Sequence, residues 1–515
     1  MYRYLLIVLV SGLMSVVSGQ HGVGAGWGDR VELPLPQGSN SVRGFLYKNS
    51  VAFSNNKRVI FMNNEDTGGG IYYTYSYDGK TWSDPVQFKP VNVPGINSTK
   101  IYRDNRDRLH VVWARPKPKA LYYTQMDSAL NVVIDSMRIA SSPRNNSYNG
   151  VYLTADLNDR LHVMWHEGDS KTEITECYYS RSTDSGESWS APQLISKDDG
   201  KASAFPRGQF GAYGGDSLMI AWRDNVSFSP ENWDLHFVTS TDGGVSWSEV
   251  TNLNSSSDFQ GDPDVVVDPG GRIHMVYHQY PQSDPYNGMR IVYGYSDDFG
   301  KSWKPSPQFK NVISDDSRSE LAEGTHYQIS TGTLWTFWKD ESERKGGGGI
   351  NIKAAFSTDR GESWSTPEYI TDFGNSPIGF KAILVLPDGS VGLNYEVPNY
   401  PDSGLYRIFY RERTPVVTAI KEPDVRQPRS FTLAQNSPNP FNPSTVLSFT
   451  LKRAGEVRLS VYDVRGRRIK TLVRGWKNAG VYRVTFEAGG LAAGVYYYRL
   501  VSGGESMVKK MILLP

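Results

Sequence analysis

One recurring position in residues 1–414 holds side chains that suit acid–base chemistry on an anionic ligand. It directly follows strand-like segments that end in an aromatic residue, such as 160–165 and 273–277. Across seven copies this position holds Asn64, Ala114, His166, Arg223, His278, Lys339 and Glu396. Histidine and glutamate carry protons, whereas arginine and lysine bind carboxylates and sulfates. His166, His278 and Glu396 are therefore candidate catalytic residues and Arg223 and Lys339 candidate substrate ligands. The alternative is that each simply begins a solvated loop.

Three further candidates lie where the chain enters the segments that we expect to form the innermost strands. Arg207 follows Phe-Pro and precedes a glycine, and His326 is followed by Tyr327. A tyrosine beside a histidine can serve as a nucleophile or a general base, and an arginine can neutralise a carboxylate. We therefore add Arg207 to the substrate ligands and His326 and Tyr327 to the catalytic candidates.

Other chemistries find no support in the sequence. Motifs for zinc, phosphate loops, dinucleotides and nucleophile elbows are missing, so we expect no metal and no cofactor. His110, His162 and His274 share a repeat position with apolar residues in other copies, and we predict that they pack inside the fold. The single cysteine, Cys177, lies in a strand-like run and is predicted to be a small buried side chain.

The elements that must position these residues are repeated turns. The pattern S-x-D-x-G-x-x-W occurs at 182–189, 240–247, 296–303 and 357–364, with a shorter copy at 76–82. Its aspartate can accept hydrogen bonds from turn amides, its glycine supplies a positive φ, and its tryptophan packs beneath the turn. The structural aspartates are Asp78, Asp184, Asp242, Asp298 and Asp359.

The strand-like segments recur seven times at steps of 50 to 61 residues. This period is typical of one four-stranded blade of a β-propeller. The seventh copy supplies only three strands, and the run 30–36 could add the fourth and close the ring. We therefore predict an all-β chain with a seven-bladed propeller; six blades with an irregular N-terminal strand pair is the alternative.

The repeated turns are Asp boxes, and residues 28–414 resemble the sialidase-like Asp-box (BNR repeat) propellers. The resemblance implies a site at one mouth of a central channel. It is specific for fold and weak for function, because such propellers include sialidases, other glycoside hydrolases, polysaccharide lyases and non-enzymes. Sialidases carry an arginine within an F/Y-R-I-P segment. Arg43 does not lie in such a segment, because it stands between Val42 and Gly44. We expect a hydrolase or lyase acting on an extracellular glycan; the alternative is a non-catalytic propeller that binds a glycan or a protein.

Charge and hydropathy restrict the location and the partners. The whole chain has a net charge of +1, but 13 Lys or Arg against 4 Asp or Glu give residues 431–515 a charge of +9 and leave −8 for the rest. An acidic body argues against nucleic acid as a partner. Residues 1–19 have a charged start, a short apolar run and small residues before a cleavage site, which is typical of a signal peptide. No later apolar stretch is long enough to span a bilayer, so we expect no transmembrane segment.

The sequence pattern changes after a polar linker at 415–430. Alternating strands separated by Gly and Asn turns over 431–515 predict a small Ig-like β-sandwich. The opening N-P-F-N-P-S-T, the turn Y-D-x-x-G-R, the strand A-G-V-Y-Y-Y and the final Lys509-Lys510-Met511 resemble the C-terminal sorting domain of type IX secretion cargo. The resemblance implies contact with the type IX machinery and release or attachment at the outer cell surface. We expect the protein to be a monomer.

Overall fold

The computed structural model describes residues 23–44, 49–64, 70–89, 99–104, 106–116, 119–141, 149–156, 159–168, 174–210, 216–225, 233–254, 258–268, 271–280, 289–304, 311–314, 319–321, 326–328, 332–340, 350–371, 379–398, 405–415, 431–436, 439–451, 455–477 and 480–514. The predicted signal peptide and nearly all of the predicted linker lie outside these residues. For Arg207, His326, Tyr327 and some other strand residues, only the backbone is described.

Within the described residues, strands β1 to β30 form seven antiparallel sheets of four or five strands, which we number as repeats 1 to 7. Repeat 1 contains β2 (Val42–Gly44), β3 (Ser50–Ala52), β4 (Arg58–Asn64), β5 (Ile71–Ser76) and β6 (Val86–Lys89). Repeat 2 contains β7 (Thr99–Arg103), β8 (Leu109–Pro116), β9 (Lys119–Met126) and β10 (Val132–Ser141). Repeat 3 contains β11 (Asn149–Ala155), β12 (Leu161–Gly168), β13 (Thr175–Ser182) and β14 (Gln193–Leu194).

The remaining four sheets follow the same order. Repeat 4 contains β15 (Ser203–Phe210), β16 (Leu218–Asn225), β17 (Trp233–Ser240) and β18 (Thr251–Asn254). Repeat 5 contains β19 (Phe259–Val267), β20 (Ile273–Tyr280), β21 (Arg290–Ser296) and β22 (Asn311–Ser314). Repeat 6 contains β23 (Ser319–Leu321), β24 (His326–Gln328), β25 (Thr333–Asp340), β26 (Asn351–Ser357) and β27 (Glu368–Tyr369). Repeat 7 contains β28 (Gly379–Val385), β29 (Val391–Pro398), β30 (Tyr406–Arg413) and β1 (Val31–Glu32).

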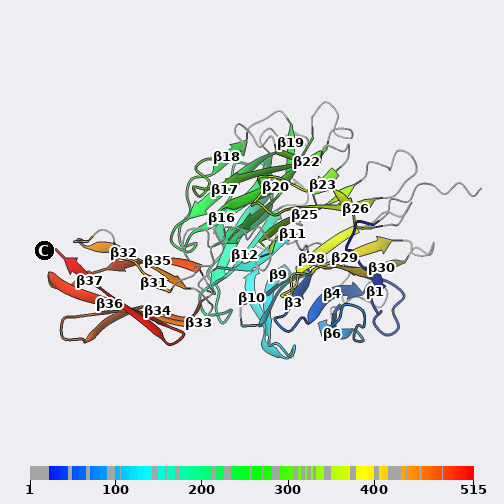
Figure 1. Ribbon diagram of the computed structural model, residues 1–515. Helices are drawn as coiled ribbons and strands as arrows, with labels where there is room; N and C mark the ends of the chain where they lie inside the picture. The colour runs from blue at the N-terminus through cyan, green and yellow to red at the C-terminus, as the bar shows by residue number, and fades with distance from the viewer. Residues whose placement is uncertain are drawn as a thin grey trace, which may run out of the picture.

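The seven sheets follow one another in chain order and are coloured from blue for repeat 1 to yellow for repeat 7 in Figure 1. Each pair of neighbouring repeats, the seventh and first included, shares one cluster of buried apolar side chains. The second strand of a repeat is consequently covered on both faces, and every residue of β12 is buried. Burial on both faces explains why these strands read as continuous apolar runs rather than as alternating ones.

The ring closes through the N-terminal strand, as the sequence predicted. Val31 of β1 pairs with Tyr410 of β30, so the first strand of the chain becomes the outer strand of the last sheet. A charged contact adds to this closure, because Arg58 of β4 donates to both carboxylate oxygens of Glu412 at 2.8 Å. Pairing with β1 gives the last sheet its fourth strand and covers the edge that β30 would otherwise leave open.

The Asp-box turns of repeats 1, 3, 4, 5 and 6 hold these sheets to the sheet before them. In the turn after β13, Asp184 accepts a hydrogen bond from the backbone N–H of Ser188 at 2.9 Å, and Gly186 donates to Ser182 at 2.8 Å. The tryptophan that ends each box meets an aromatic ring in the third strand of the preceding repeat. These edge-on pairs are Trp82 with Tyr410, Trp189 with Tyr123, Trp247 with Tyr179, Trp303 with Phe237 and Trp364 with Tyr293, with centroids 5.0 to 6.3 Å apart.

The turn glycines allow this contact. Gly186, Gly244 and Gly361 adopt φ values between +79° and +96°, which favour glycine. A Cβ at Gly244 would lie 2.1 Å from the hydroxyl of Tyr179, and a Cβ at Gly361 would lie 1.8 Å from that of Tyr293. The turn can therefore contact the tyrosine hydroxyl of the neighbouring sheet only because a glycine, which has no side chain, occupies this position.

Three of the box-bearing contacts are backed by a buried histidine. His110, His162 and His274 are fully buried, and each Nδ1 lies 2.7 Å from the hydroxyl of Tyr123, Tyr179 or Tyr293. Each Nε2 lies 3.2 to 3.3 Å from an aspartate: Asp104, Asp156 or Asp268. Burial lowers the pKa of all three histidines, although the aspartates oppose the shift. The prediction that these histidines pack inside the fold is confirmed.

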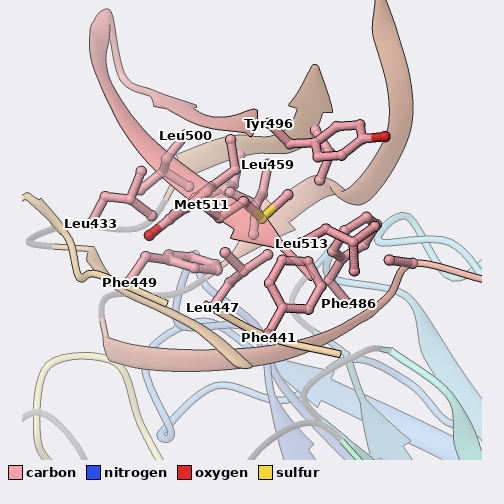
Figure 2. Close-up of a cluster of buried hydrophobic side chains, with 14 of the residues drawn as sticks. Leu433, Phe441, Leu447, Phe449, Leu459, Phe486, Tyr496, Leu500, Met511 and Leu513 are labelled. Atoms are coloured by element: carbon pink, nitrogen blue, oxygen red, sulfur yellow. The ribbon is translucent and has the colours of Figure 1, made fainter. Parts of the chain in front are cut away.

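The C-terminal strands form a separate two-sheet sandwich, drawn in orange and red in Figure 1. One sheet contains β31 (Thr432–Leu433), β32 (Ser444–Leu451) and β35 (Gly480–Glu487); the other contains β34 (Arg468–Lys477), β33 (Gly455–Tyr462), β36 (Gly494–Ser502) and β37 (Glu505–Leu513). Figure 2 shows their shared core, where Phe449 and Leu447 of one sheet face Leu500 and Met511 of the other. No helix of the described residues has the length and apolarity needed to span a membrane.

We predict that the histidine–tyrosine contacts stabilise the ring. Replacement Tyr179→Phe keeps the edge-on contact with Trp247 but removes the hydroxyl that meets His162, so the free energy of unfolding should fall by about 1 to 2 kcal/mol. Thermal or chemical denaturation would measure this change. The matched control is Tyr77→Phe, because Tyr77 is 55% exposed. Equal stability of the two variants would contradict a role for the contact.

Candidate functional site

The strand register places five of the sequence candidates at one end of the ring, which we call the rim. His166, Arg223, His278, Lys339 and Glu396 each lie opposite one of the first three residues of the innermost strand of their sheet. Their partners are Asn149, Ala204, Gly261, Glu320 and Gly379 respectively. Because repeats 3 to 7 are neighbours in the ring, these five rim residues occupy the same level on five adjacent sheets. Asn64 holds the same level in repeat 1, opposite Val42.

The rim residues differ in exposure. His166, His278 and Glu396 are 3 to 5% exposed, whereas Arg223 and Lys339 are half-buried. The cations are therefore the rim groups that a ligand in solution can reach most directly. The three proton-carrying side chains are almost fully buried.

His278 is held in place by the backbone and by two aromatic rings. Its ring stacks on Phe259 at 5.7 Å, and Phe259 stacks on Tyr280 at 4.2 Å. A Cβ at Gly261 would come within 2.2 Å of the Nε2 of His278. The missing side chain of Gly261 is thus what allows the imidazole to lie across the innermost strand.

Arg223 is oriented by a cation–π contact. Its guanidinium carbon lies 4.8 Å from the ring centre of Trp233, in the next strand of the same sheet. A contact of this kind lowers the freedom of a long side chain and keeps its donors directed. The contact thus restricts the directions in which the guanidinium of Arg223 can point.

Bulges interrupt the innermost strand just beyond the rim. The register shifts between Asn149 and Tyr152, between Ala204 and Arg207, between Gly261 and Asp264, and between Phe380 and Ala382. Bulges re-aim neighbouring side chains and are common beside binding sites. The sequence argument missed them, although Pro206 and Pro263 inside strands were a usable signal, since proline within a sheet marks an edge or a bulge.

Arg207, His326 and Tyr327 do not lie at the level of the rim. Arg207 is opposite Ala221, two residues before Arg223. His326 and Tyr327 lie within β24 opposite Trp335 and Leu334, four and five residues before Lys339, which is about 13 to 17 Å along a strand. His326 begins β24, which pairs with β25 beside β23 (Ser319–Leu321).

The structure adds buried carboxylates that the sequence argument did not identify. They follow the rim residue by one position, as Glu167, Asp224 and Asp340, and all are at most 6% exposed. Asp224 accepts hydrogen bonds from Ser203 at 2.6 Å and from the indole of Trp222 at 3.0 Å. The recurrence of an acid directly after the rim position was the signal available in the sequence. These acids anchor the strands that carry Arg223 and its counterparts.

Glu176 is the most perturbed carboxyl near the rim. It is fully buried, lies opposite Glu167 in the register, and accepts a hydrogen bond from Ser196 at 2.5 Å. Burial raises its pKa to about 7, against the hydrogen bond from Ser196, and the charges of Asp198 and Asp224 add to the rise. Glu176 therefore holds a proton close to neutral pH. Among the residues that the structure describes, no group of three or more His, Cys, Asp or Glu is arranged to bind a metal.

Comparison with protein families identifies two regions of the chain. Residues 125–327 match the BNR repeat-like domain, and residues 437–514 match the secretion system C-terminal sorting domain. The sorting domain directs the protein through type IX secretion to the outer surface or the extracellular space. No curated protein matches the sequence.

Solved structures with a similar arrangement are remote in sequence. A polysaccharide lyase of family PL25, an ulvan lyase, is 10% identical, with 72% of this chain and 93% of that chain covered and a TM-score of 0.49. The α-L-arabinofuranosidase of Fusarium graminearum is 15% identical, with 75% and 97% covered and a TM-score of 0.40. The intramolecular trans-sialidase of Ruminococcus gnavus is 16% identical, with 75% and 97% covered and a TM-score of 0.37.

The chain thus contains a BNR repeat-like domain and a type IX sorting domain, and it is built from strands throughout its described part.

We predict that Glu176 makes the protein less stable as the pH rises. The folded state keeps a proton that the unfolded chain releases near its ordinary pKa, so stability is full below about pH 4.5 and falls as the pH approaches 7. Replacement Glu176→Gln removes this loss. The free energy of unfolding of the variant, relative to that of the unchanged protein, should therefore be about 1 to 3 kcal/mol higher at pH 8 than at pH 5. Denaturation curves at both pH values measure it. The exposed Glu187→Gln serves as control, and the same pH trend in both variants would contradict the assignment.

Proposed function

We propose that this protein is a secreted enzyme that cleaves a carboxylated polysaccharide by β-elimination at the rim of a seven-bladed propeller. The observation that carries the proposal is the alignment of two cations, two histidines and one glutamate on five adjacent sheets. We assign the signal peptide to residues 1–19, the propeller to 28–414, the linker to 415–430 and the Ig-like sorting domain to 431–515. We propose a monomer.

The residue types at the rim favour elimination over hydrolysis. Glycoside hydrolysis ordinarily uses two carboxyl groups that flank the bond, and Glu396 is the one carboxylate among the five rim residues. Elimination needs a cation that neutralises the uronic carboxylate and acidifies the α proton, a base that takes this proton, and an acid that protonates the leaving oxygen. Arg223 and Lys339 suit the first role, and His166, His278 and Glu396 suit the others.

The atoms balance in a simple way. The base removes the proton at C5 of the uronate, the C4–O bond breaks, and a C4=C5 double bond forms. The leaving oxygen takes a proton from the acid, so the polymer is divided without water. His278 is our choice for the base, because the ring is fixed by Phe259 and Gly261 and needs little reorganisation.

A second candidate function is glycan binding without catalysis. It is favoured by the low exposure of His166, His278 and Glu396, since a general base must come within hydrogen-bond distance of its proton. In that case Arg223 and Lys339 would hold the polymer and the three buried groups would be structural. Hydrolysis is the remaining alternative within the enzyme class.

An activity screen with matched variants tests the proposal. The intact chain is incubated with polygalacturonate, ulvan, sialosides and a neutral arabinan, and both the ultraviolet absorbance of the new double bond and new reducing ends are measured. We expect absorbance with an anionic polymer, a loss of at least about 100-fold in kcat for His278→Ala, and a rise of about tenfold in KM for Arg223→Ala. Lys301→Ala, at an exposed position of an Asp box, should leave both constants unchanged.

The other outcomes separate the alternatives. Reducing ends without absorbance would show hydrolysis and would refute elimination. Retention of an anionic polymer with no product, lost in Arg223→Ala, would support the binding function. Full activity of a correctly folded His278→Ala variant would remove His278 from the mechanism.

A further inference from the structure

The four-stranded sheet of the sorting domain presents exposed side chains on the face opposite its core. The inward residues of this sheet, among them Leu459, Leu500 and Met511, pack in the core shown in Figure 2. Side chains alternate across a strand, so the residues between them point outward. The outward positions in register include Arg458 and Arg474, Tyr462 and Tyr497, and Arg499 and Val508. We call this surface the outer face.

The outer face concentrates positive charge in a way that costs stability. Arg458 of β33 lies directly opposite Arg474 of β34, and both side chains are exposed. Like charges directly opposite one another destabilise a sheet. Among the described residues, no carboxylate comes within ion-pair distance of either arginine, and Arg499 donates only to Ser506 at 3.1 Å. Glu456 lies on the same face, two residues from Arg458 and opposite Trp476, and forms no ion pair with either arginine among the described residues. The facing arginines therefore favour an anion between the strands.

Aromatic rings lie on the same face as the arginines. The side chain of Trp476 is 46% exposed and that of Tyr497 is 37% exposed. Trp476 follows Arg474 by two residues on the same strand, and Tyr497 pairs with Tyr462 and with Lys510 across its two neighbours. Rings of this kind offer an apolar surface and a polar tip to a flat partner. Each of the two exposed rings therefore has a cation near it on this face, and Trp476 also lies opposite Glu456.

We propose that the outer face of the sorting domain binds an anionic polysaccharide, separately from the site at the rim. The arginines pair with carboxylate or sulfate groups of successive sugars, and Trp476 and Tyr497 stack against the sugar rings between them. Charge complementarity selects a polyanion, since the domain carries 13 cations against 4 carboxylates. We favour a polysaccharide over a lipid headgroup because Trp476 and Tyr497 lie within strands, beside arginines, and not at a loop tip that could insert into a bilayer. The proposal does not depend on catalysis at the rim.

Binding of defined probes by the intact chain tests the proposal. All proteins carry Arg223→Ala and Lys339→Ala, so that retention reports on the sorting domain. The probes are polygalacturonate, dextran sulfate, neutral dextran and vesicles of phosphatidylglycerol. The test variant Arg458→Gln/Arg474→Gln is compared with Arg465→Gln/Lys509→Gln, which removes the same charge from exposed positions that lie off the outer face.

We expect binding to both anionic polymers and none to dextran. The affinity should fall at least about tenfold in Arg458→Gln/Arg474→Gln and change little in the control pair. Trp476→Ala, which keeps the charge, should also weaken binding. Equal losses of affinity in the two double variants would show that only overall charge matters and would contradict a site on the outer face. Tighter binding to vesicles than to the polymers would favour a lipid surface instead. No binding to either anionic polymer would refute the proposal. Thermal melting confirms that each variant folds.

Discussion

The contact between each Asp-box turn and the aromatic ring of the preceding sheet is the interaction on which the ring depends. A sheet whose second strand is apolar on both faces is stable only between two neighbours, so every repeat needs the next one. The boxes fix the distance between neighbours because a glycine of the turn rests directly on a tyrosine hydroxyl, as Gly244 does on Tyr179. A buried histidine then holds that hydroxyl from the other side. Repeat 7 replaces the histidine by Gly392 and instead uses Glu412 and Arg58 to secure the seam.

This constraint separates the two ends of the sheets in their chemistry. The end that carries the boxes repeats the same residue types, because the same contact forms at five of the seven interfaces. The opposite end has no such requirement, and there the residue after the aromatic changes from histidine to arginine, lysine or glutamate. The fixed spacing of the sheets brings these different groups to one level. A rigid ring with a variable rim is a suitable frame for holding several unlike groups around one ligand.

The sorting domain adds a second chemistry to the same chain. The first 430 residues carry a net negative charge and the last 85 a positive one, so the two parts prefer different surroundings. The rim offers half-buried cations among buried proton carriers, whereas the outer face of the domain offers exposed arginines beside aromatic rings. If both bind anionic polymer, the domain would hold the chain near its substrate and raise the local concentration at the rim.

The sequence alone determined the repeats, the Asp boxes, the closing strand and the shared level of His166, Arg223, His278, Lys339 and Glu396, because these follow from local periods and from turn chemistry. Only the tertiary structure decided which of them are exposed, since burial depends on the neighbouring sheet. It also placed His326 and Tyr327 four and five residues before the level of Lys339, because cross-strand register is not visible as a change of residue type. Glu176 and the facing pair Arg458 and Arg474 remained hidden for the same reason: cross-strand register and desolvation belong to the partners of a residue, which a linear pattern does not name.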